Sequence, residues 1–165
     1  NFDTDIVTDK APQNFIWIGF IKIFFPNSKI IHCSRNPKDN CLSIFKNQFS
    51  SNTMSWSYDH TLVAKYYNLY LEMMNFWKLK YNDFIFDANY EKIVTSPESE
   101  VKKMLLFCDL NWESECLNFY QNKKTPVQTA SVSQASKPIY KSSINTSSGF
   151  SKYLSEMFEI LDTKS

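Results

Sequence analysis

Apolar residues are spaced along the chain in ways that predict several helices. Residues 15–25 are apolar at nearly every position and predict a largely buried helix that ends before Pro26. Between residues 61 and 80 the apolar residues recur at helical spacing, which predicts a long helix with one face on the core. That face would comprise Leu62, Val63, Tyr66, Leu69, Tyr70, Met73, Phe76 and Trp77, with Lys65, Asn68 and Glu72 on the opposite side.

Two shorter runs predict strands. Residues 30–33 are mostly apolar and partly β-branched, a pattern typical of a strand buried on both faces. Residues 83–87 predict a second strand that ends near Tyr90. Two strands are too few for a freestanding sheet that buries both faces. We therefore expect parallel members of a larger α/β sheet whose other strands lie upstream, so that residues 1–165 form the C-terminal part of one domain.

The second half of the chain combines helical signals with one long irregular stretch. Ser96, Pro97 and two acids in the following turn predict the start of a helix. Further helices are predicted at residues 113–120 and 150–161. Residues 122–148 are rich in Ser, Thr and Lys and have little periodicity. A stretch of that length inside a compact domain is usually functional or disordered.

The first predicted strand is followed directly by polar residues whose order suggests a phosphate site. Asn36 is a good N-cap, Pro37 suits the first helical position, and Asp39 falls in the acid-favouring first turn. Arg35 would project from the carboxyl end of the strand, where open α/β sheets bind ligands, and Ser43, two turns on, can face the same side. An arginine fork with a hydroxyl is a common clamp for a phosphate dianion. The same residues equally fit an ordinary strand–turn–helix with a surface arginine.

Composition narrows the classes of function. A length of 165 residues fits one domain, and the net charge of +1 argues against a nucleic-acid partner. Only two glycines occur, so a glycine-rich phosphate loop of the Walker or dinucleotide type cannot be encoded. Residues 15–25 are too short to span a bilayer and are interrupted by Lys22, so no membrane segment is expected. The first residue is Asn1 rather than methionine, from which we expect a fragment or a processed chain.

The cysteines and histidines argue against a metal cofactor. The four cysteines form no C-x-x-C pair, and only His32 and His60 could join them as ligands. Cys33 and Cys108 lie in apolar runs and are expected to be reduced residues of the core.

The strand–turn–helix segment that contains Arg35 and Ser43 closely resembles the 3′-phosphate-binding strand and helix of sulfotransferases that use 3′-phosphoadenosine 5′-phosphosulfate (PAPS). Four further segments, in the right order, are similar to the same family. Residues 8–19 resemble its D-K-x-P-x-N-F-x-x-I-G run, and residues 25–32 its F-P-N-A-x-I-I-H approach to the arginine. Residues 90–98 resemble Y-E-x-L-V-x-x-P-E, and residues 129–143 the late T-A-S-x-x-Q…P-I-Y-x-S-S segment. The greatest similarity is to bacterial sulfotransferases that are often joined to tetratricopeptide repeats and are related to the tyrosylprotein sulfotransferases.

The resemblance implies a fold and half of a cofactor site. The fold would be the P-loop NTPase-like three-layer α/β fold of sulfotransferases, of which this chain forms the helix-rich C-terminal part with a few short parallel strands. Arg35 and Ser43 would hold the 3′-phosphate of PAPS, and Tyr90 matches the tyrosine beside the adenine pocket.

The resemblance also implies the remaining contacts to the cofactor. Ser131 and Lys137 match positions in a loop that closes over the nucleotide, so residues 122–148 would form a cofactor-covering loop. Lys10 matches the lysine that reaches the phosphosulfate. During sulfuryl transfer to an acceptor hydroxyl, negative charge grows on the departing 5′-phosphate oxygen, and a fixed cation acts most strongly on that charge. Lys10, helped by Ser131, is therefore the catalytic candidate.

The chain departs from the family pattern in three places. The P-R-S-G-T-T-like loop that wraps the 5′-phosphosulfate is absent, and so is a matched general base. His32 alternates with core residues of the strand and His60 falls in a predicted loop, so both are poor substitutes for that base. Phe150 stands where relatives usually have a tryptophan. We therefore expect the chain to be inactive alone and to bind the nucleotide half of PAPS.

Several functions stay open from the sequence. The acceptor could be a protein tyrosine, a glycan or a small alcohol, and upstream tetratricopeptide repeats would be possible partners. One alternative is a non-catalytic sulfotransferase-like interaction module. Another is a phosphotransferase of the related P-loop class, which would need Mg²⁺ ligands and a lysine–hydroxyl loop that this sequence does not contain. Analogy with the family favours the cytoplasm.

Overall fold

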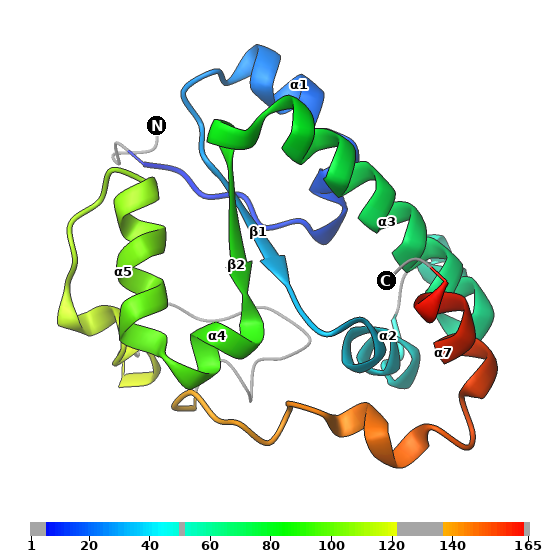
Figure 1. Ribbon diagram of the computed structural model, residues 1–165. Coiled ribbons are helices and arrows are strands. Elements are labelled where there is room, and N and C mark those ends of the chain that lie inside the picture. The colour runs from blue at the N-terminus through cyan, green and yellow to red at the C-terminus, as the bar shows by residue number, and fades with distance from the viewer. Residues whose placement is uncertain (1–5, 50–51, 122–136, 164–165) are drawn as a thin grey trace.

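Two parallel strands lie at the centre of the molecule, which is described by a computed structural model covering residues 6–49, 52–121 and 137–163 (Figure 1). Strand β1 (Ile30–Ser34) pairs with β2 (Ile85–Asn89), and the register runs from Ile30 opposite Ile85 to Ser34 opposite Asn89. The helices are α1 (Ile18–Phe24), α2 (Pro37–Lys46), α3 (His60–Lys80), α4 (Tyr90–Thr95), α5 (Pro97–Phe107) and α7 (Ser155–Asp162). Short 3-10 turns cover Pro12–Ile16, Asn52–Tyr58, Asn82–Phe84, Ser114–Cys116, Phe119–Gln121 and Thr146–Phe150.

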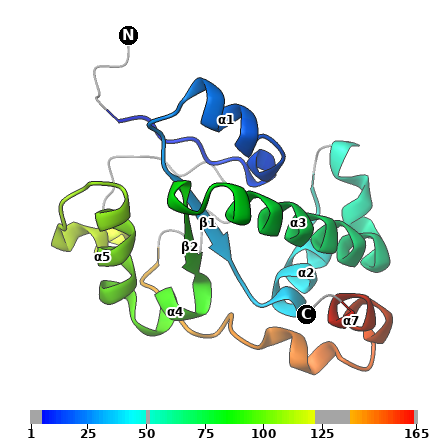
Figure 2. The same ribbon diagram turned by 45° about the horizontal axis from the view of Figure 1, so that its top comes forward.

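Helices cover the small sheet from two sides. Figures 1 and 2 both place α5 beside β2 and α3 on the other side of the strands. On one face, Phe107 of α5 meets Phe86 of β2 with the ring centroids 5.4 Å apart. On the other face, Tyr70 of α3 reaches His32 of β1. Because neighbouring residues of a strand point to opposite faces, these contacts define a helix–sheet–helix arrangement.

The apolar core forms two clusters joined by α3. The first lies between α2, α3 and α7, and the second between α1, α3, β2 and the turn at Pro12–Ile16. The buried members of the first are Cys41, Leu42, Val63, Ala64, Tyr67, Leu154, Met157, Phe158 and Leu161, and those of the second are Phe15, Ile18, Met74, Phe84 and Ile85. The long helix therefore fixes the position of the sheet relative to α2 and α7.

Several predicted elements are confirmed. The strands pair in parallel, α2 begins at Pro37, α5 begins at Pro97, and one helix spans residues 60–80. Local capping explains two of these starts, because Asn36 accepts a hydrogen bond from the Asp39 amide, and Asp59 accepts from two amides at the start of α3. The irregular character of residues 122–148 is confirmed for 137–145; residues 122–136 lie outside the described residues.

Other predictions about secondary structure are wrong. The predicted helix at 15–25 is a 3-10 turn followed by the seven-residue α1. This segment is not largely buried, since Ile23 is 70% and Phe24 69% exposed. The predicted helix at 113–120 consists of two short 3-10 turns. The last helix starts at Ser155 rather than at residue 150, and α4 was not predicted at all. Short helices of this kind depend on tertiary packing more than on propensity.

The predicted burial is also wrong at several positions. Cys33 is exposed, so β1 is not buried on both faces among the described residues, and Cys108 is only half-buried. On α3, Leu69 is exposed, whereas Asn68 is buried and donates its amide Nδ2 to the carbonyl of Ile160 at 2.8 Å. His60 is the first residue of α3 rather than part of a loop.

None of the helices in the described ranges combines the length and hydropathy that crossing a membrane requires.

Candidate functional site

The register of the sheet brings the first residues after both strands together. Ser34 and Asn89 are the last pair, so Arg35 and Tyr90 follow them at the same edge. The guanidinium carbon of Arg35 lies 5.0 Å from the centroid of the Tyr90 ring, within the range of a cation–π contact. This edge is the carboxyl end of the parallel strands, where α/β sheets bind their ligands.

The Arg35 guanidinium is only partly satisfied by the protein. Its Nη2 donates to the carbonyl oxygen of Ser143 at 2.5 Å. Its Nε is buried and has no hydrogen-bond partner in the described part of the chain. A buried N–H without an acceptor costs roughly 1–3 kcal/mol, so such a group in a native structure is a candidate for ligand binding.

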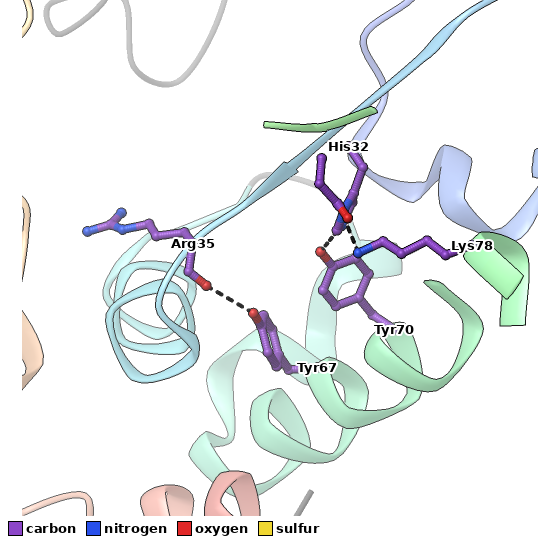
Figure 3. A network of polar contacts seen from close by, with 6 residues as sticks. His32, Arg35, Tyr67, Tyr70 and Lys78 are labelled. Atoms are coloured by element: carbon purple, nitrogen blue, oxygen red, sulfur yellow. Dashed lines mark hydrogen bonds and ion pairs between the residues drawn. The ribbon is translucent and has the colours of Figure 1, made fainter. Parts of the chain in front are cut away.

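Two neighbouring side chains fix the backbone at this edge. Glu91 accepts hydrogen bonds from the Asn36 amide at 2.8 Å and from the Asn89 side chain at 3.0 Å, and so bridges the ends of the two strands. The hydroxyl of Tyr67 donates to the Arg35 carbonyl at 3.2 Å (Figure 3). Burial raises the pKa of Tyr67 well above its ordinary value, so the phenol keeps its proton and remains a donor.

Asp39, in the first turn of α2, connects this edge to the segment that carries Ser143. Its carboxylate accepts hydrogen bonds from the amides of Asn145 at 2.6 Å and Ser147 at 2.8 Å, and from the Thr146 hydroxyl at 3.3 Å. Burial favours the neutral acid, but the hydrogen bonds from Ser147 and Asn145 and the nearby Arg35 charge outweigh it, and the pKa of Asp39 is lowered. Asp39 is therefore an ionised group at neutral pH.

A second polar group lies further back on β1. The Nδ1 atom of His32 is 2.5 Å from an oxygen of Asp87, and its Nε2 contacts the hydroxyl of Tyr70. Lys78 pairs with the same Asp87 at 2.7 Å. Burial lowers the pKa of His32; the hydrogen bond to Asp87 opposes that shift and the charge of Lys78 adds to it. Figure 3 shows the Arg35 side chain pointing away from this group.

The remaining predicted site residues are Ser43, Lys10, Lys137 and Ser131. Ser43 is half-buried on α2, two turns after its cap. Lys10 is exposed in the segment that precedes the turn at Pro12–Ile16, and Lys137 is exposed as well. Neither the Lys10 nor the Lys137 side chain forms a hydrogen bond or ion pair with another residue of the described ranges. Ser131 lies outside the described residues.

Three contributors to the site were not predicted: Asp39 as an anchor, the Ser143 carbonyl, and Tyr67. The partners of Asp39 are at least 106 residues away in sequence, so no local pattern could reveal them. Tyr67 lies among core residues of α3, where an aromatic side chain is expected for packing alone. No cluster of three or more His, Cys, Asp or Glu side chains fit to hold a metal ion occurs among the residues that the structure describes.

Comparison with known proteins identifies the class of the chain. Residues 2–114 match the sulfotransferase family, and the chain belongs to that family. The resemblance to sulfotransferases is thus confirmed at the level of the family, whose general chemistry is sulfuryl transfer. The helix-rich structure with its short parallel sheet is compatible with the α/β fold of that family.

A much longer protein is similar to this chain over most of the chain's length. The chain is 34% identical over 157 residues to an uncharacterized protein of Aquifex aeolicus (strain VF5), a match that covers 94% of this chain and 20% of that protein. The chain thus spans about a fifth of the length of this relative.

Proposed function

We propose that the chain supplies the 3′-phosphate and nucleotide-binding half of a PAPS-dependent sulfotransferase site. The observation that carries this proposal is the Arg35 guanidinium, which lies at the carboxyl edge of the sheet with a buried Nε that no described group satisfies. A guanidinium presents its N–H groups in a planar fork that matches a phosphate. One arm of the fork is held by Ser143, which leaves the remaining donors for an anion.

The neighbouring residues fit a nucleotide at the same edge. Ser43, on the same helix that begins beside Arg35, would add a hydroxyl to the 3′-phosphate. Tyr90 would border the adenine, because its ring already lies against the guanidinium at 5.0 Å. Lys137 and Ser131 would contact the nucleotide from residues 122–148, acting as a covering loop.

The chemical step would use groups from two parts of the protein. In sulfuryl transfer the bond between the sulfur and the 5′-phosphate oxygen of PAPS breaks, and the acceptor oxygen bonds to sulfur while it loses its proton. Lys10, with Ser131, would stabilise the charge on the departing oxygen. The general base and the loop around the phosphosulfate would come from a part of the protein outside residues 1–165.

The wider assignments rest on the family. We place the chain in the C-terminal part of a P-loop-like three-layer domain, and the helices on both faces of the sheet support this. Within the family, the chain would belong with the tetratricopeptide-linked bacterial sulfotransferases. The acceptor would be a hydroxyl of a protein tyrosine, a glycan or a small molecule, and the reaction would take place in the cytoplasm.

Nucleotide binding tests the proposal. The intact protein should bind adenosine 3′,5′-bisphosphate more tightly than AMP in calorimetric titrations. Arg35→Ala should weaken binding of the bisphosphate by about 1.5–3 kcal/mol, the value of a hydrogen bond to a charged group, and should leave AMP binding nearly unchanged.

A nearby cation provides the control. Lys38 lies in the first turn of α2 but pairs with Asp162 at 2.8 Å, so Lys38→Ala removes one positive charge from the same helix and should not change the preference. A wild-type protein that binds both nucleotides equally would contradict the proposal and favour a non-catalytic interaction module.

A further inference from the structure

A buried carboxylate fastens the segment at residues 143–147 to the start of α2. Asp39 is only 1% exposed, and its two oxygens accept the amides of Asn145 and Ser147 at 2.6 and 2.8 Å. A buried carboxylate is costly unless it is fully hydrogen-bonded, and these contacts meet that requirement. The attachment is therefore specific rather than incidental.

The backbone of the segment is shaped to receive this carboxylate. Asn145 has a left-handed conformation with φ of 59° and ψ of 29°, which asparagine tolerates better than most residues. Successive amides around a left-handed residue form a concave anion-binding nest. Here the nest is filled by a side chain of the protein itself.

The same segment orients Arg35. Ser143, two residues before the nest, offers its carbonyl oxygen to Nη2 of Arg35 at 2.5 Å. That contact holds one side of the planar guanidinium and leaves the buried Nε free of partners within the described ranges. The nest thus holds in place the segment whose Ser143 carbonyl lies beside the guanidinium.

We infer that Asp39 is a positioning residue of the proposed phosphate site: it anchors residues 143–147 so that the Ser143 carbonyl sets the orientation in which Arg35 meets the 3′-phosphate. This inference rests on the proposed function. It assigns part of the selectivity for a 3′-phosphorylated nucleotide to contacts between α2 and residues at least 106 positions later in the chain.

The first test needs no nucleotide. Asp39→Asn keeps the shape of the side chain but replaces one acceptor oxygen by an NH₂ group, which cannot accept an amide hydrogen. Hydrogen exchange at the amides of residues 145 and 147, followed by NMR in the intact protein, should accelerate roughly tenfold or more. Unchanged exchange would overturn the anchoring role of Asp39.

The second test measures selectivity. Asp39→Asn should lower the ratio of the affinities for adenosine 3′,5′-bisphosphate and AMP about tenfold and change the affinity for AMP little. Asp59→Ala, which removes the side-chain N-cap of α3, is the control for general destabilisation. A merely structural effect would lower both affinities together and leave the ratio as it is in the wild type.

A variant pair outside the core covers the case in which Asp39→Asn does not fold. Asn145 is exposed, so its replacement leaves the buried carboxylate in place. Asn145→Val disfavours the left-handed conformation and should reduce the selectivity ratio, whereas Asn145→Gly permits that conformation and should preserve it.

The outcomes separate the two proposals. A wild-type protein without a preference for the 3′-phosphate would overturn the proposed function, while the exchange experiment would still report on the anchor. A wild-type preference that survives both Asp39→Asn and Asn145→Val, with faster exchange at residues 145 and 147, would overturn the positioning role and leave the proposed function intact.

Discussion

Two polar side chains of the same strand region, His32 and Arg35, have opposite surroundings. Both ring nitrogens of His32 contact protein groups, one on β2 and one on α3. Arg35, three residues further on, has one nitrogen on a carbonyl and a buried Nε without a partner in the described part of the chain. We call the His32 group closed, because both of its ring nitrogens have partners, and the Arg35 group open, because its Nε has none among the described residues.

The difference separates a structural role from a binding role. A buried network whose members are all satisfied fixes how its elements pack, here α3 against the two strands. A buried donor that lacks an acceptor lowers the stability of the ligand-free protein, and binding of an anion to that donor removes the penalty. We therefore expect changes at His32 to appear in stability and changes at Arg35 to appear in affinity.

Removing the imidazole should have the largest effect on stability. His32→Ala leaves the Tyr70 hydroxyl without its partner inside the protein, and it removes one hydrogen bond from Asp87. We expect the free energy of unfolding to fall by about 2–4 kcal/mol, measured by urea denaturation. Arg35→Ala in the same assay should change stability by less than about 1 kcal/mol, because the lost hydrogen bond to Ser143 is offset by the removal of a buried N–H without an acceptor in the described residues. Equal losses at both positions would remove the distinction between the two groups.

A smaller effect is expected from the hydroxyl that supports Arg35 from below. Tyr67→Phe keeps the ring in the core but removes the donor to the Arg35 carbonyl. Stability should fall by about 0.5–1.5 kcal/mol, the net value of one hydrogen bond. The affinity for adenosine 3′,5′-bisphosphate should fall more than the affinity for AMP, because the strand end that carries Arg35 is loosened. A loss of stability with an unchanged affinity ratio would assign Tyr67 to the core alone.

The smallest effect is a pH dependence that belongs to the closed group. The pKa of His32 in the folded protein lies below its ordinary value of 6.5, because burial disfavours the imidazolium. The unfolded chain therefore binds the proton more readily, and stability should fall as the pH decreases from about 6.5 toward the lower folded value. His32→Gln should remove this slope in unfolding experiments between pH 7 and pH 5.

A separate acidic window offers an internal check on that experiment. The pKa values of Asp39 and Asp87 are lowered from 3.8, so their contribution is present above 3.8 and is lost as the pH falls through their folded values. The part of this loss that comes from Asp39 should persist in His32→Gln, whereas the part from Asp87 should shrink, because the hydrogen bond from His32 helps to lower the pKa of Asp87. A slope between pH 7 and pH 5 that is the same in the wild type and in His32→Gln would contradict the neutral, buried state of His32.

The sequence predicts those features that short-range chemistry determines. Asn36 and Pro37 fix the start of α2, and the apolar run before Arg35 fixes the strand, so the arginine was correctly expected at the carboxyl end. The helix over residues 60–80 follows from its periodicity, but the buried side does not. Apolar residues occur around much of α3, and only the position of α7 decides that Asn68 is buried and Leu69 exposed.

Long-range contacts account for what the sequence could not predict. The role of Asp39 depends on amides more than a hundred residues away, and nothing near Asp39 distinguishes it from an ordinary first-turn acid. The exposure of Cys33 depends on which strands and helices cover β1, which an apolar run alone does not specify. The roles of Lys10, Ser131 and Lys137 stay predictions, because they require a bound nucleotide.

The two strands end at paired residues, Ser34 and Asn89, and this limits how the region can change over evolution. Strand residues alternate between faces and advance about 3.3 Å each, so one residue inserted into β2 would shift Tyr90 along the edge and turn Asp87 away from His32. An insertion or deletion within residues 30–35 or 85–90 would therefore damage the closed group and the open group together. Substitutions can alter either group separately, so we expect this part of the protein to vary by replacement and to keep its length.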